Sequence, residues 1–164
     1  MNNEHLIKVD LCCGINKPDG FIGVDHFPGD KVDIVADLKE RFPFEDNSVD
    51  VVRAHSTIEH LPDKIHTMNE IWRICKPNAI VDISVPSTDG RGAFQDPGHV
   101  SYWNINSFLY YSVNHPLEYE LCKRYGFRGE FKIEDIYNVC GFDSAIYVHV
   151  ILRSIKPDAG TTGV

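Results

Sequence analysis

The chain has 164 residues, of which 43% are hydrophobic and 24% charged, and this composition predicts one globular domain over residues 1–164. A net charge of -8 argues against a broad nucleic-acid surface, and no run is apolar enough to span a membrane. The N-terminus is polar and acidic, unlike a signal peptide, and the five cysteines form an odd set. We therefore expect reduced thiols in a cytoplasmic protein. Residues 156–164 are expected to form a loose tail.

Apolar runs bounded by turn residues predict five strands in the first half of the chain. These runs are continuous more often than alternating, which is typical of a parallel sheet covered on both faces. Between Pro62 and Cys75, apolar residues recur at helical spacing, and Pro62 can open a helix as its first residue. The five strands are expected at residues 6–11, 21–25, 32–36, 49–53 and 79–85.

The second half predicts a long polar loop over residues 87–103, a short helix at 107–111 and two further strands. These strands, at residues 127–133 and 145–155, are expected to form an antiparallel pair at the sheet edge. The connection at residues 12–20 is too short for a normal crossover helix. The predicted fold is therefore α/β and three-layer Rossmann-like, with a mostly parallel sheet, an antiparallel C-terminal strand pair, and a missing or reduced helix after the first strand.

The ends of the first two predicted strands carry the most informative residues. The first strand ends in Asp10 and a small-residue turn that includes Gly14, and the second ends in Asp25. In an open parallel sheet, ligands bind outside the carboxyl ends of the strands. A carboxylate at a strand tip can accept hydrogen bonds from both hydroxyls of a ribose, so this pair predicts a nucleoside cofactor site. The alternative for Asp25 is a cap on its own turn, and for Asp10 a bond to turn amides.

Four phrases then follow in a characteristic order and spacing. They are an acidic turn ending in glycine, a Pro-Phe phrase rich in Asp, a Glu-His-Leu phrase, and an Arg phrase ending in Lys-Pro. Their positions are residues 10–14, 43–50, 59–61 and 73–79. With these phrases the chain resembles class I S-adenosylmethionine-dependent methyltransferases, and in particular their small type 11 branch.

The resemblance implies S-adenosyl-L-methionine as the cofactor and assigns a set of residues to it. Asp25 would hold the ribose, Asp37 with Leu38 would lie near the adenine, and the segment after the fourth strand would line the methyl-donating face. Cys12 stands where the family has its first glycine. The implied cofactor-binding residues are Asp10, Cys12, Cys13, Gly14, Asp25, Asp37, Leu38 and His55.

The implied reaction is methyl transfer to an oxygen or nitrogen of an acceptor, which we expect to be a small molecule. An alternative is a cofactor-binding or inactive accessory module, because the glycine turn is incomplete and a helix is missing. A nicotinamide-dependent oxidoreductase is disfavoured, since Asp25 comes too early and the Gly-x-Gly-x-x-Gly pattern is absent. Nucleic-acid and membrane partners are not expected, and a homo-oligomer is left open.

Three histidines are candidates for removing the acceptor's proton, because histidine titrates near neutral pH. They are His99, in the phrase Asp96-Pro97-Gly98-His99, and His55 and His60 after the fourth strand. The alternative for His60 is a buried ring bonded to backbone, and for His99 a ring that locks its loop through Asp96. No metal is expected, because His55 and His60 lack i, i+4 spacing and no Cys-x-x-Cys pair occurs.

Overall fold

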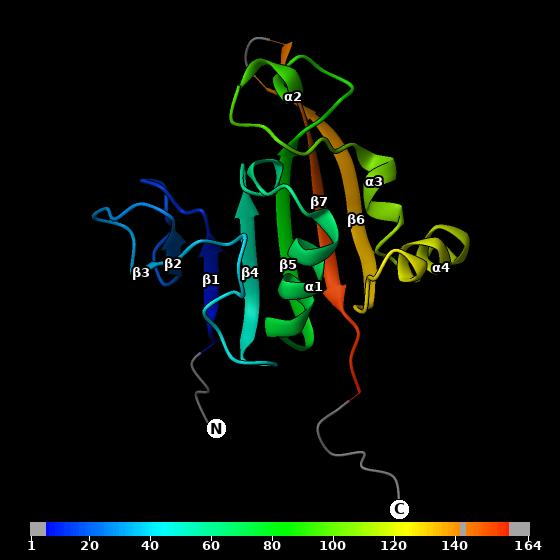
Figure 1. Ribbon diagram of the computed structural model, residues 1–164, viewed down its shortest axis with the longest axis horizontal. Coiled ribbons are helices and arrows are strands. Elements are labelled where there is room, and N and C mark those ends of the chain that lie inside the picture. Colours follow the sequence, from blue (N-terminus) through cyan, green and yellow to red (C-terminus); the bar gives the residue numbers. More distant parts are fainter. Residues whose placement is uncertain (1–5, 142–143, 158–164) are drawn as a thin grey trace, which may run out of the picture.

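A computed structural model describes residues 6–141 and 144–157 of the chain, and its centre is a seven-stranded sheet (Figure 1). The strand order is β3-β2-β1-β4-β5-β7-β6. Strands β1 to β5 are parallel, and β7 runs antiparallel to both β5 and β6. The predicted fold class and antiparallel pair are therefore confirmed. The strands are β1 (Lys8–Leu11), β2 (Ile22–Asp25), β3 (Ile34–Val35), β4 (Val49–His55), β5 (Cys75–Pro86), β6 (Phe131–Cys140) and β7 (Ile146–Ser154).

Helices follow only the later strands of the described chain. The predicted helix after β4 is confirmed as α1, and Asp63 caps it by accepting a hydrogen bond from the backbone N–H of His66 at 2.9 Å. The short helix predicted at residues 107–111 begins two residues earlier, as α3, while α2 and α4 were not predicted. Among the described residues, no helix has the length and apolarity needed to cross a membrane. The helices are η1 (Ile58–His60, 3₁₀), α1 (Lys64–Ile74), α2 (Gly92–Gln95), α3 (Ile105–Leu109) and α4 (Pro116–Arg124).

One face of the sheet forms the hydrophobic core. Residues paired across neighbouring strands point to the same side, so Val9, Val52, Val81 and Leu152 form one fully buried row. Helix α1 lies in front of β5 in Figure 1 and contributes Met68, Ile71 and Ile74 to the same core. This packing fixes which side chains of each strand face away from the helices.

The opposite face is polar. Asp10, Arg53 and Asp82 are paired across β1, β4 and β5 and so form one row on it. In the part of the chain that the structure describes, no helix connects β1 to β2, β2 to β3 or β3 to β4, which confirms the predicted loss after β1 and extends it. Loops pack closely on β2 at Gly23 instead, where an added Cβ would lie 2.5 Å from the carbonyl oxygen of Lys31.

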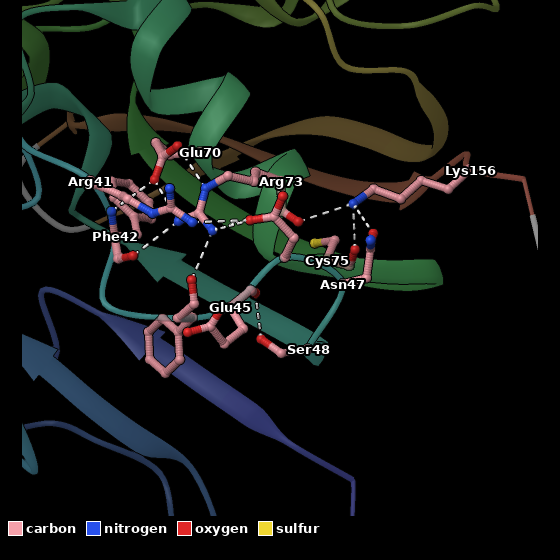
Figure 2. Close-up of polar contacts among 11 residues, drawn as sticks. Arg41, Phe42, Glu45, Asn47, Ser48, Glu70, Arg73, Cys75 and Lys156 are labelled. Carbon is pink, nitrogen blue, oxygen red and sulfur yellow. Dashed lines mark hydrogen bonds and ion pairs between the residues drawn. The ribbon is translucent and has the colours of Figure 1, made fainter. Parts of the chain in front are cut away.

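A polar network joins the end of α1 to the loop before β4 (Figure 2). The Arg73 guanidinium donates to both carboxylate oxygens of Glu70 at 2.8 and 2.7 Å, and to the carbonyls of Phe42 and Phe44. Arg73, from the sequence motif at residues 73–79, therefore holds the Pro-Phe motif at residues 43–50 in place.

The start of the predicted loose tail is fixed rather than loose. The ammonium of Lys156 donates to the carbonyl of Cys75 and to the side chain of Asn47, both at 2.6 Å, and lies 4.2 Å from the ring centroid of Trp72. Lys156 is thereby tied to the end of α1, as Figure 2 shows. The part of the tail at residues 158–164 lies outside the described residues.

Candidate functional site

A pocket of about 400 Å³ opens at the carboxyl ends of the first four strands. The strand order reverses between β1 and β4, and such a reversal is where open α/β sheets bind ligands. Four predicted cofactor residues line this pocket and four do not. The lining residues are Cys12, Asp25, His26, Phe27, Ala36, Asp37, Leu38, Lys39, Ser56, His60 and Leu61. The predicted cofactor residues outside it are Asp10, Cys13, Gly14 and His55.

Asp25 fits both interpretations offered by the sequence. Its Oδ2 accepts a hydrogen bond from the backbone N–H of Gly14 at 3.0 Å, and its Oδ1 accepts one from that of Phe27 at 3.1 Å. Each carboxylate oxygen has two lone pairs, so the same group can cap its turn and still accept from a ligand. Asp37 is similar, because its Oδ1 accepts from the N–H of Lys39 at 2.9 Å. Both carboxylates are held in place by backbone at the rim of one pocket.

The turn after β1 uses the left-handed backbone region twice. Cys12 has φ of 49° and Gly14 has φ of 50°. An added Cβ at Gly14 would meet nothing within 4 Å, so glycine is favoured there by conformation and not by crowding. Cys12 adopts the same conformation with a side chain, which costs about 1–2 kcal/mol. Burial, reinforced by Asp25, raises the pKa of Cys12 to about 12, so this pocket thiol is neutral.

Asp10 and Cys13 lie outside the pocket because they face the polar side of the sheet. Asp10 is fully buried and accepts a hydrogen bond from Nη1 of Arg53 at 2.8 Å. Burial raises the pKa of Asp10 despite this partner. The Sγ of Cys13 is 3.6 Å from the carbonyl of Lys31 and packs over Gly23. Asp10 is thus tied to β4, and Cys13 to the loop between β2 and β3.

His60 and His99 are brought together with a buried carboxyl group. The centroids of their rings are 5.0 Å apart, and each Nδ1 lies 3.0 Å from a backbone carbonyl, that of Gly98 for His60 and of Ala93 for His99. Glu59 is 1% exposed, and its Oε1 is 4.0 Å from Nε2 of His99. Burial raises the pKa of Glu59 to about 7. His60 lines the pocket, so His99 and Glu59 lie behind it.

The segment over residues 87–103 lies at the carboxyl end of β5, as its polar, glycine-containing sequence predicted (Figure 1). It is not structureless, since it contains α2 and is fastened at its far end. The N–H groups of Val100 and Ser101 both donate to the carbonyl of Glu59, at 2.8 and 3.0 Å, and Trp103 is fully buried. These contacts hold His99 against Glu59 and away from bulk solvent.

His55 is directed away from the pocket, because it belongs to the polar row of β4. Its Nε2 is 2.9 Å from Oδ1 of Asp82, and the same oxygen is 2.7 Å from Nε2 of His149. Burial raises the pKa of Asp82, but the hydrogen bonds with the two histidines outweigh it and leave this pKa below its usual value. The sequence did not single out Asp82 and His149, which reach His55 only through the pairing of β4, β5 and β7.

Comparison with known proteins supports the methyltransferase class that the sequence resembles. The model of a methyltransferase domain, of type 11, matches residues 13–83, and no curated protein matches the chain. A chain from the complex between the Haloferax volcanii Trm112 methyltransferase activator and a methyltransferase is 15% identical, with a TM-score of 0.64, over 93% of this chain and 84% of that one.

Two further solved structures share the fold. An S-adenosylmethionine-dependent methyltransferase from Methanosarcina mazei is 12% identical, with a TM-score of 0.62, over 94% of this chain and 95% of that one. The [4+2]-cyclase SpnF is 15% identical, with a TM-score of 0.63, over 93% of this chain and 75% of that one. Fold, pocket and matched domain together define a class I methyltransferase, an enzyme whose cofactor is S-adenosylmethionine. The matched domain model, over residues 13–83, is that of the type 11 branch.

Proposed function

We propose that this enzyme transfers the methyl group to an oxygen or nitrogen of a small-molecule acceptor, with cofactor and acceptor meeting at the pocket beside His60. The observation that carries the proposal is the joint placement of Asp25, Asp37 and His60 around one cavity. Its volume of about 400 Å³ lies within the range of small-molecule sites. Asp25 and Asp37 supply carboxylates for ribose and base, and Leu38 and Phe27 supply apolar surface.

The cofactor supplies a methyl group on a positively charged sulfur, ready for in-line displacement. The protein's task is to align the acceptor behind that methyl group, to exclude water, and to take up the acceptor's proton. With its Nδ1–H donating to the carbonyl of Gly98, His60 keeps Nε2 as an acceptor at the pocket. His60 is therefore the candidate base, and the ring of His99 packs behind it, with centroids 5.0 Å apart. His55 has no part in this proposal, because it faces the other side of the sheet.

Calorimetric titration with S-adenosylmethionine tests the cofactor half of the proposal. Asp25→Asn keeps the size of the side chain but removes its charge, and should weaken binding at least about tenfold, because hydrogen bonds to charged groups contribute about 1.5–3 kcal/mol each. Asp19→Asn is the matched control, an exposed carboxylate that does not line the pocket. Equal affinity in all three proteins would overturn the assignment of Asp25. Binding by the wild type without any turnover would favour the accessory-module alternative.

A further inference from the structure

Three side chains from neighbouring strands converge on the polar face of the sheet, outside the cofactor pocket. His55 on β4 and His149 on β7 are both paired with Ser84 of β5, so their rings flank this central strand from either side. Asp82 lies two residues earlier on β5 and faces the same way. One potential ligand atom from each of the three side chains lies within 4.8 Å of the other two. We refer to His55, Asp82 and His149 as the open-face cluster.

The orientation of both rings is suited to a cation. The two Nε2 atoms point at the same carboxylate oxygen, at 2.9 Å for His55 and 2.7 Å for His149. Two ligands bound to one tetrahedral zinc ion lie about 3.4 Å apart, given bond lengths of about 2.0–2.2 Å. The side chains therefore need to separate by only about half an ångström to admit an ion. Nδ1 of His149 is 3.4 Å from the hydroxyl of Tyr137, a partner of the kind that orients metal-binding histidines.

The surroundings also allow an ion to enter. The three side chains are 25–31% exposed, and in the described part of the chain no helix connection covers β4 from this side. The cationic side chain of Arg53 lies in the same row as Asp82, but it is paired with the carboxylate of Asp10 at 2.8 Å. The cluster itself offers one carboxylate and two imidazoles, the ligand types that suit zinc and related divalent ions.

The Glu59, His60 and His99 group is a weaker candidate for the same chemistry. Its carboxylate and the Nε2 of His99 are no closer than 4.0 Å, and His60 faces the pocket. The open-face cluster is tighter, and none of its three residues lines the pocket. We propose that His55, Asp82 and His149 bind one divalent transition-metal ion, of which Zn²⁺ best suits the ligands. Three protein ligands leave at least one coordination position for water.

The test starts from wild-type protein dialysed against a chelator. Titration with Zn²⁺ by calorimetry should show one ion bound per chain, and Co²⁺ should give visible d–d absorption as a report on coordination. His149→Gln and Asp82→Asn should each weaken binding at least about tenfold, because each removes a direct ligand. His60→Gln is the matched control, since it removes a histidine from the other group. Circular dichroism and the thermal midpoint of each chelated variant establish that it is folded.

The outcomes separate clearly. Loss of binding in folded His149→Gln and Asp82→Asn, with binding retained in His60→Gln, supports the site. Three results overturn it: wild-type protein that binds no ion, affinity unchanged in both cluster variants, or affinity lost only in His60→Gln. None of these results depends on methyl transfer, because the cluster does not line the cofactor pocket.

Discussion

The buried carboxyl group of Glu59 makes stability depend on pH in a direction opposite to that of ordinary acidic residues. Burial raises the pKa of Glu59 from 4.5 to about 7 in the folded protein. The folded chain therefore keeps this proton between about pH 4.5 and 7, while the unfolded chain loses it. The unfolded state binds fewer protons in that window, so the free energy of unfolding falls as pH rises. At about 1.36 kcal/mol per pKa unit, the total loss is about 3 kcal/mol.

Glu59→Gln isolates this effect because it keeps the shape of the side chain and cannot ionise. Urea unfolding of both proteins at pH 5, 6, 7 and 8 gives the free energy of unfolding at each pH, and the quantity to follow is wild type minus variant. We expect that difference to fall by about 2.5 kcal/mol from pH 5 to pH 8 and to become flat above the pKa of Glu59. Titrating groups that do not interact with Glu59 cancel in the difference. A constant difference across this range would refute the reasoning, and a rising one would show that Glu59 is stabilised as a carboxylate.

Three other substitutions test separate parts of the structure. Gly23→Ala should lower the free energy of unfolding by about 1–3 kcal/mol through overpacking. Gly14→Ala should lower it less, because only the positive φ opposes a side chain there, and equal effects would contradict the close approach at Gly23. Arg73→Met should cost about 1–3 kcal/mol because it removes the charged partner of the half-buried Glu70 carboxylate, whereas Arg41→Met, at an exposed pair, should cost under about 1 kcal/mol in the same urea assay. His60→Gln should lower the rate of S-adenosylhomocysteine formation by roughly 10²–10⁴ without changing cofactor affinity, and an unchanged rate would exclude it as the base.

Features that are local in the chain were predicted well. Each parallel strand is an apolar run bounded by turn residues. Asp25 and Asp37 stand at the ends of such runs, so the sequence placed both at strand ends, where the structure has the pocket. Helix α4 was missed because only Cys122 of its nine residues is buried, which leaves no apolar stripe to detect. Strand β6 was expected at residues 127–133 but spans Phe131–Cys140. This edge strand is mostly exposed, and Glu134 and Asp135 interrupt its alternation of apolar and polar residues.

Features that depend on strand pairing could not be predicted. Successive residues at a strand end can face opposite sides of the sheet. His55, the last residue of β4, belongs to the open-face cluster, whereas Ser56, the next residue in the chain, lines the pocket. Asp82 and His149 meet His55 only through the register of β5 and β7. The sequence likewise gives no sign that Glu59 is fully covered by the segment that carries His99.

The uneven strand lengths imply that the two halves of the sheet differ in how readily they open. Strands β5, β6 and β7 have nine to twelve residues each, whereas β1 and β2 have four and β3 has two, with loops in place of helices beside them. Backbone amides of β2 and β3 should therefore exchange with deuterated solvent through local opening, long before those of β5 and β7. The pocket that we propose for the cofactor lies on this weaker half. Ligand binding there should slow exchange most in β2 and β3, since a ligand that binds only the closed form stabilises it by mass action.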